Sequence, residues 1–206
     1  MKVTIVAGAP HQDRAFINKN IDRQSFVIAA DAGHRILDFE PDLIVGDFDS
    51  SERPDCSCPV VTLNPVKNDS DTFDCVQRAV ERGATQIEFF GALGGRIDHT
   101  LANIHALIYC AQQGIDAKII DPGNVLYVCK DKTVIPKGTF HYFSVYSLFG
   151  SAQGLTITGA KYPLQDHYLE QYAQLTLSNE VAEDCAQAEI CVKKGTLLII
   201  LSNDFA

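Results

Sequence analysis

The chain has 206 residues, a formal net charge of -9 at pH 7, 46% hydrophobic and 21% charged residues. This length allows one large domain or two modest ones, each with its own core, and the composition is ordinary for a soluble globular protein. The acidic balance and the lack of any basic run argue against nucleic acid as a partner, and no apolar stretch is long enough to span a bilayer.

The first 121 residues alternate short β-branched runs with segments of helical periodicity. This alternation predicts an α/β domain with a mostly parallel sheet covered by helices. The expected strands are Val3–Ala7, Phe26–Ala30, Leu43–Val45, Val60–Leu63, Ile87–Phe90 and Ala117–Ile120.

Two helices are expected between these strands, each starting just after an acidic motif and ending at a glycine that suits a C-cap. Their apolar positions and ends are Phe73, Val76, Val80 and Gly83 for the first helix and Leu101, Ile104, Ile108, Ala111 and Gly114 for the second. The expected residues at their starts are Ser70 or Asp69 and Asp98 or His99, respectively.

From Val125 onward, short strand-like segments alternate with turn residues, which predicts an all-β domain, either a sandwich or a barrel. The turn-forming run Asp121-Pro122-Gly123-Asn124 divides the chain into domains of residues 1–122 and 123–206. The expected strands are Val125–Cys129, Thr133–Ile135, Tyr142–Leu148, Leu155–Ile157, Gln174–Leu177, Ala188–Val192 and Thr196–Leu201.

The seven cysteines form no C-x-x-C pairs, so we expect reduced thiols and a cytoplasmic protein. Cys56-Ser57-Cys58 lies in a loop flanked by prolines. A redox or metal role is disfavoured there, because cysteine pairs that bind metal usually have at least two residues between them.

Acidic side chains follow several of the predicted strands. Asp47 and Asp49 are two residues apart, so on an extended segment both could reach one ion while Phe48 faces the core. The carboxyl ends of parallel strands meet at one edge of a sheet, and carboxylates gathered there would repel one another without a cation. Magnesium suits such oxygen ligands and keeps positions for water and phosphate. The sequence therefore predicts a magnesium and phosphate site.

The segment Gly91–Arg96 adds backbone N–H groups near a helix start and the guanidinium of Arg96, which can donate two parallel hydrogen bonds. Both are suited to phosphate. Its glycines match no established phosphate-loop pattern, so by themselves they indicate only a turn. Lys67 lies beside the acidic residues, where it can contact phosphate or remain solvated.

Several motifs recur in order along the chain: Asp31-Ala32-Gly33, Gly46-Asp47-Phe48-Asp49-Ser50, Lys67 to Asp71, Gly94-Gly95-Arg96-Ile97-Asp98-His99 with Thr100, Leu101 and Asn103, and Ser178-Asn179-Glu180. Taken together, these motifs resemble the thiamin pyrophosphokinase family over nearly the whole length. The resemblance implies transfer of a diphosphoryl group from ATP to the hydroxyl of thiamin, giving thiamin diphosphate and AMP with Mg²⁺. It also implies a catalytic domain that binds ATP and Mg²⁺ (1–122), a β-sandwich for thiamin binding and dimerisation (123–206), and a homodimer with active sites between subunits.

Three positions depart from the family pattern. Ala32 replaces the first glycine of Asp-Gly-Gly, and Asn68 takes the first acidic position of a K-D-x-T-D element, unless Asp69 fills that role by a shift in register. The chain has no Trp, so Tyr162 would stack on thiamin in place of the Trp that some members use.

The resemblance and the motifs assign roles to named residues. In catalysis we expect Asp47, Asp49, Asp71, Arg96 and Asp98, with Asp47, Asp49 and Asp71 holding the metal. Asp98 would bind the aminopyrimidine or organise its loop. In contact with ATP or thiamin we expect Asp31, Gly33, Ser50, Lys67, Asn68, Asp69, Ser70, Gly94, Gly95, His99, Asn103, Tyr162, Ser178 and Asn179.

Two other functions remain open from the residues alone. Gly46 to Ser51 also fits the D-x-D-x-S loop of phosphatases, in which Asp47 would be a nucleophile and would form an aspartyl-phosphate. A thiamin or nucleotide sensor without catalysis is the second alternative, although it would have less need for so many carboxylates.

Overall fold

The computed structural model describes residues 1–48, 53–64, 69–147 and 150–204. The predicted site residues Asp49, Ser50, Lys67 and Asn68 lie outside the described ranges. The chain divides into two compact units, Met1–Pro122 and Gly123–Ala206.

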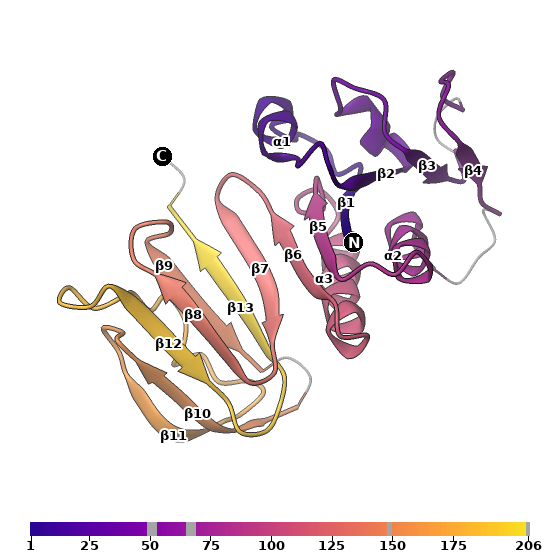
Figure 1. Cartoon of the computed structure of the whole chain (residues 1–206). Coiled ribbons are helices and arrows are strands. Elements are labelled where there is room, and N and C mark those ends of the chain that lie inside the picture. Colours follow the sequence, from indigo (N-terminus) through magenta and orange to yellow (C-terminus); the bar gives the residue numbers. More distant parts are fainter. Residues whose placement is uncertain (49–52, 65–68, 148–149, 205–206) are drawn as a thin grey trace. The chain divides into compact units, whose positions relative to one another are not determined.

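The first unit contains a sheet in which every strand pair is parallel. All six predicted strands are confirmed, with small shifts at their ends. Their spatial order is β4-β3-β2-β1-β5-β6, so the order reverses between β1 and β5 at the centre of the sheet (Figure 1). The strands are β1 (Lys2–Val6), β2 (Phe26–Ala30), β3 (Leu43–Gly46), β4 (Val60–Thr62), β5 (Gln86–Phe90) and β6 (Asp116–Ile120).

Both predicted helices are present, as α2 (Asp71–Glu81) and α3 (Ile97–Gln112). Ser70 caps α2 by accepting a 3.2 Å hydrogen bond from the Phe73 amide. The expected start of α3 is wrong, because its N-cap residue is Arg96 and the side chain of Arg96 makes no capping bond. Two short helices were not predicted, α1 (Arg14–Asn20) and the 3₁₀ helix η1 (Asp31–Arg35).

The buried face of α3 differs from the expected one. Leu101 is 50% exposed. The buried residues are Asn103, Ala106, Leu107 and Cys110. The predicted positions Ile104, Ile108 and Ala111 are partly buried beside this stripe, so the predicted face is offset by about one residue from the buried one.

The second unit is a β-sandwich, as predicted. One sheet holds β7, β13 and β9 in antiparallel pairing, and the other has the order β11-β10-β12-β8. Apolar residues from both sheets, including Phe143 and Leu197 from one and Leu155 and Ile190 from the other, form a single buried cluster. The strands are β7 (Asn124–Cys129), β8 (Lys132–Pro136), β9 (Tyr142–Tyr146), β10 (Ala152–Thr158), β11 (Leu164–Leu169), β12 (Gln187–Cys191) and β13 (Leu197–Ser202).

One predicted strand of this unit is wrong and one strand was missed. Gln174–Leu177 forms turns, with Leu175 and Leu177 about half exposed and Thr176 buried. The Thr176 hydroxyl donates to the Val145 carbonyl at 2.5 Å, so the polar residue faces inward and the alternation that suggested a strand is reversed. The missed strand is β11.

In the described ranges, no helix combines the length and the apolar character needed to cross a membrane.

Candidate functional site

A pocket of about 600 Å³ lies in the first unit at the edge of the sheet where the strands end. Its walls include Ala7 to Pro10 after β1 and Gly91 and Ala92 after β5. These two strands flank the reversal of strand order, which is where open α/β sheets bind their ligands. The parallel sheet therefore places the pocket at the position that such a topology favours.

Three aspartates from separate segments line this pocket. Asp31 follows β2, Asp47 follows β3, and Asp71 opens α2. Among the described residues these carboxylates do not form a group whose ligand atoms all lie within 4.8 Å of one another. The shared pocket, and not close approach of the three carboxylates, is therefore what relates them.

Asp31 is the least satisfied of these acids. Its Oδ1 is buried and has no hydrogen-bond partner among the described residues. Its backbone has a φ of 45°, in the left-handed region that Asp tolerates better than most residues. A buried carboxylate oxygen without a donor is costly, and a hard cation would compensate it. The donor set of this pocket therefore fits Mg²⁺.

The segment after β3 is not extended, which corrects one step of the sequence argument. Phe48 has a φ of 52°, so the backbone turns there, and simple alternation of side chains does not apply. Phe48 nevertheless packs against the buried cluster of the first unit, as expected. The turn directs Asp47 to the pocket.

The glycine-rich loop packs closely on the segment after β1. A Cβ added to Gly95, whose φ is 68°, would lie 2.6 Å from Cδ of Pro10. The Gln12 side chain donates to the carbonyls of Pro10 at 3.1 Å and Leu93 at 2.9 Å and so joins the two segments. Sequence reasoning missed Gly8, Pro10 and Gln12, although the run Ala7-Gly8-Ala9-Pro10 directly after a strand was the available signal.

Arg96 and Asp98 form a bidentate ion pair at the N-terminus of α3. Arg96 donates from Nε to Oδ1 at 3.1 Å and from Nη2 to Oδ2 at 2.6 Å. The hydrogen bond from Arg96 is the main reason that the pKa of Asp98 is lowered. Both side chains are more than 60% exposed. Arg96 lines the pocket, whereas Asp98 does not line it and contacts it only through Arg96.

Most of the predicted residues of the first unit meet at this pocket. Asn103 is buried and its amide donates to the Ala92 carbonyl at 2.7 Å, which ties α3 to the loop after β5. Gly33 does not line the pocket. It packs instead against the backbone after β1, where an added Cβ would lie 2.0 Å from the Val6 carbonyl oxygen. Asp69 is exposed and also lies outside the lining. The predicted residues that do line the pocket are Asp31, Asp47, Ser70, Asp71, Gly94, Gly95, Arg96, His99 and Asn103.

In the second unit, the structure brings Tyr162 and Asn179 together. The buried Asn179 accepts a bond from the Tyr162 amide at 3.1 Å and donates to the Tyr162 carbonyl at 2.8 Å. The Tyr162 side chain is 56% exposed, with the Lys161 ammonium 5.7 Å from its ring centre. Ser178 has a φ of 53° and its amide donates to the Ser144 hydroxyl. Asn179 thus holds the backbone that presents the Tyr162 ring.

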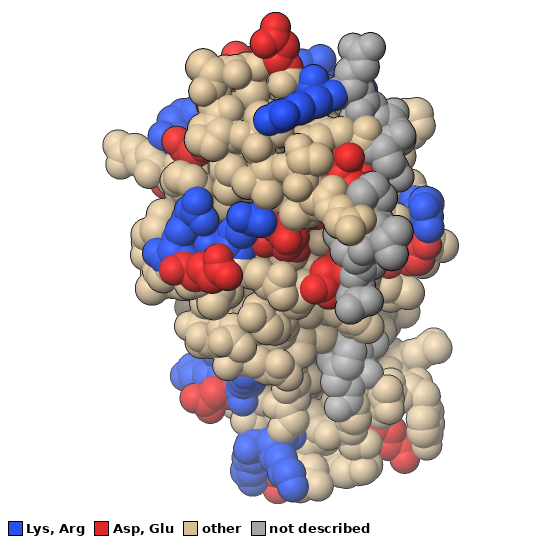
Figure 2. All heavy atoms as spheres, turned by 90° about the vertical axis from the view of Figure 1, so that its right-hand side faces the viewer, with Lys and Arg blue, Asp and Glu red and all other residues tan. Residues whose placement is uncertain are grey.

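The charged side chains on the face shown in Figure 2 are mixed in sign. Blue basic groups lie beside red acidic groups, and in the described part of that face they form no continuous basic surface. This face therefore lacks the strip of positive charge that favours a nucleic-acid backbone.

Family models and known proteins were compared with the chain. Residues 17–119 match the model "Thiamin pyrophosphokinase, catalytic domain", and residues 132–197 match "Thiamin pyrophosphokinase, vitamin B1 binding domain". A thiamine pyrophosphokinase from Bacillus subtilis is 28% identical over 98% of this chain and 99% of its own length.

Solved structures agree with this match. The crystal structure of thiamine pyrophosphokinase from Bacillus subtilis has a TM-score of 0.88 and 26% identity, with all of both chains covered. That of thiamin pyrophosphokinase from Geobacillus thermodenitrificans has a TM-score of 0.85 and 26% identity, covering 100% of this chain and 99% of that one. With both family models matched in order along one chain, this protein belongs to the thiamin pyrophosphokinase family, enzymes that transfer a diphosphoryl group from ATP to thiamin.

Proposed function

We propose that this chain converts thiamin and ATP to thiamin diphosphate and AMP at the pocket of its first unit. The observation that carries the assignment to this pocket is the buried Oδ1 of Asp31, which has no partner among the described residues, in a pocket that Asp47 and Asp71 also line. Phosphoryl transfer gains most of its acceleration from positioning and from neutralisation of charge, and the pocket supplies groups for both.

Asp31, Asp47 and Asp71 are the described residues that would hold Mg²⁺, together with Asp49 from the sequence argument. When bound, the ion would neutralise charge on the ATP phosphates and orient them. Asp31 is added to the expected metal ligands because of its buried oxygen. The remaining roles belong to side chains and backbone groups of the chain itself.

Arg96 would contact the transferring diphosphoryl group, since its planar fork matches phosphate oxygens. Two of its N–H groups donate to Asp98, which orients the guanidinium beside the pocket and leaves its other donors for phosphate. We therefore assign Asp98 to the positioning of Arg96, which favours the loop-organising role over direct contact with the aminopyrimidine. Backbone N–H groups of Gly94 and Gly95 would add further donors to phosphate.

For thiamin, we propose stacking of the cationic heterocycle on the exposed ring of Tyr162. An aromatic face attracts a cation, and Asn179 fixes the backbone at this position.

We further propose that the enzyme is a homodimer. Of the nine exposed large hydrophobic residues in the described chain, five fall within residues 162–177, and a concentration of this kind is typical of protein–protein contacts. These are Tyr162, Tyr168, Tyr172, Leu175 and Leu177.

The test is a reaction of purified protein with thiamin, ATP and Mg²⁺, with chromatographic separation of the products. Thiamin diphosphate and AMP in equal amounts are expected. Free phosphate or ADP without a thiamin product, or an aspartyl-phosphate trapped on Asp47, would contradict the proposal and favour a phosphatase. Thiamin binding without turnover would indicate a sensor.

A further inference from the structure

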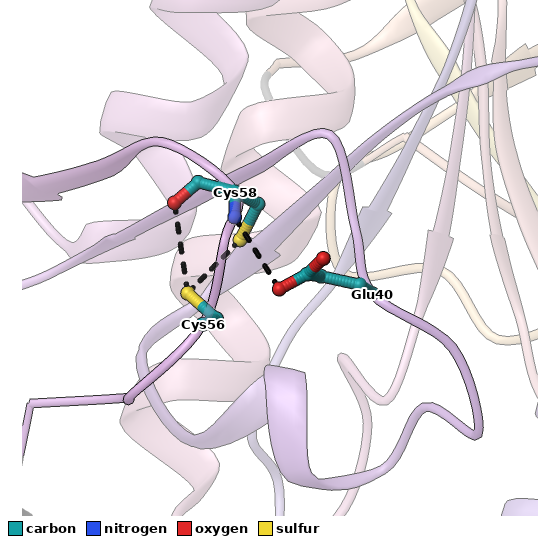
Figure 3. A group of neighbouring side chains, drawn as sticks. All are labelled: Glu40, Cys56 and Cys58. Carbon is teal, nitrogen blue, oxygen red and sulfur yellow. Dashed lines mark hydrogen bonds between the residues drawn. The ribbon is translucent and has the colours of Figure 1, made fainter.

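Glu40, Cys56 and Cys58 form a second cluster of polar side chains in the first unit (Figure 3). One ligand atom from each lies within 4.8 Å of the other two, and in the described part of the chain no other trio of His, Cys, Asp or Glu is as compact. The two sulfur atoms are 3.1 Å apart and point toward one another. None of the three residues lines the pocket described above.

The cluster lies at the opposite edge of the sheet from the pocket. Glu40 precedes β3 and Cys58 precedes β4, and these two strands run parallel with Ile44 beside Val60. Both residues therefore lie at the amino ends of their strands, whereas Asp47 leaves the carboxyl end of β3. Any ligand bound by the cluster is separate from the nucleotide site.

The Glu40 carboxylate holds the cysteine loop in place. It accepts bonds from the Ser57 amide at 2.5 Å, the Ser57 hydroxyl at 2.5 Å and the Cys58 amide at 3.3 Å. These bonds, that of the Ser57 hydroxyl above all, lower the pKa of Glu40, so it is ionised at neutral pH. A carboxylate has about four lone-pair sites, so three donors leave capacity for one further contact.

The loop is bent at Ser57 and Cys58. If the segment were straight and extended, the Cys56 and Cys58 side chains would lie on the same face, with their Cα atoms about 6–7 Å apart. The bend brings the sulfurs much closer than that. Tertiary structure thus adds a carboxylate to a cysteine pair whose spacing alone did not predict a metal site.

We propose that Glu40, Cys56 and Cys58 bind a thiophilic divalent cation of the zinc class, with water as the fourth ligand. Two sulfurs exclude Mg²⁺ as the natural occupant and favour zinc, for which three protein ligands plus water is an established arrangement. A zinc-class ion displaces the proton of a coordinating thiol, and its charge offsets that of the three anionic ligands.

The cation would join two loops, with water in a position that structural zinc sites usually fill with a fourth protein ligand. It would fasten the loop before β4, the short edge strand of the sheet, to the loop before β3.

The experiment uses the full chain, reduced and stripped of metal, titrated with Co²⁺ as a spectroscopic probe. We expect one Co²⁺ per chain with thiolate-to-cobalt charge-transfer absorption, which a carboxylate site such as the Mg²⁺ pocket does not produce, and displacement of Co²⁺ by Zn²⁺. The double variant Cys56→Ser/Cys58→Ser should lose the absorption. Glu40→Gln should keep it and weaken Co²⁺ binding by more than about tenfold.

The matched control is Cys185→Ser, which removes a partly buried cysteine whose sulfur lies 3.7 Å from a carboxylate oxygen of Asp184. It should leave the titration unchanged. Absence of charge-transfer absorption in the wild type, or its survival in the double variant, would overturn the proposal. So would a Cys56–Cys58 disulfide, seen as five instead of seven thiols when a separate sample, purified without reductant, is denatured and its thiols are counted. Thiamin diphosphate formation by the double variant should persist, so this proposal and that of the pocket's function fail independently.

Discussion

At the scale of single residues, Asp31 combines a left-handed backbone with a buried carboxylate oxygen that lacks a partner. We expect Asp31→Asn to raise the midpoint of thermal unfolding in metal-free buffer, because it removes an uncompensated charge while Asn tolerates the same backbone. Activity should fall by more than about 100-fold. Thermal scans with and without Mg²⁺ and a turnover assay measure both effects.

The control for this substitution is Asp116→Asn, at an exposed position of β6. It should change neither the unfolding midpoint nor the stabilisation by Mg²⁺. Full activity of Asp31→Asn at saturating Mg²⁺ would remove Asp31 from the metal ligands.

The Arg96–Asp98 pair gives a second prediction at this scale. Asp98→Asn should lower kcat/KM for ATP by about tenfold, because Arg96 loses the two-pronged contact that orients it. The free energy of unfolding should not change measurably, since both side chains are exposed.

The same ion pair depends on pH. The pKa of Asp98 is lower in the folded protein than in the unfolded chain, so the ion pair is fully formed at pH values above the unfolded-state pKa. It is lost as the pH falls through the folded-state pKa. Steady-state kinetics checks the first effect, and Lys193→Met, which removes another exposed ion pair, should leave kcat/KM unchanged.

Single residues also mark where sequence reasoning reached its limit. The acids at strand ends were predictable, because strand polarity brings them to one edge. The burial of the Asp31 oxygen, the contact of Gly33 with the Val6 carbonyl and the link from Gln12 to Leu93 were not, because each depends on a backbone that approaches from another strand.

At the scale of elements, the loop after β5 depends on close packing against the segment after β1. Gly95→Ala should destabilise the protein by about 1–2 kcal/mol and lower activity about tenfold, because a Cβ meets Pro10 on a left-handed backbone. Gly83→Ala is the matched control, since Gly83 has a similar φ of 75° with nothing within 4 Å of an added Cβ. It should cost about 1 kcal/mol with no loss of activity. Denaturant unfolding and turnover distinguish the two.

The cap of α2 gives a further prediction for an element. Ser70→Ala removes the bond to the Phe73 amide and should cost about 1 kcal/mol of unfolding free energy, and Ser70→Asp should recover most of it. Because Ser70 lines the pocket, KM for ATP should rise in Ser70→Ala. Asp13→Ala, which removes the cap of α1, should destabilise without changing KM.

At the scale of the whole molecule, the proposed homodimer has a direct test. Light scattering should give about 45 kDa, twice the 22.6 kDa of the chain. The double variant Tyr172→Ser/Leu175→Ser should shift the mass to that of one chain, because it removes two of the exposed apolar side chains. Val134→Ser, which changes an exposed apolar residue on β8, should leave the mass unchanged. A wild-type mass of 22.6 kDa would contradict the dimer.

The sequence by itself determined the fold class, the six strands of the first unit, and the acids that follow them, because short β-branched runs bounded by turn residues are local signals. Only tertiary structure decided which face of α3 is buried, that Thr176 rather than its leucine neighbours points inward, and that Glu40 joins Cys56 and Cys58. In each of these cases the partner atoms come from a distant segment. Their position is set by packing and by the parallel register of the strands, which no local pattern records.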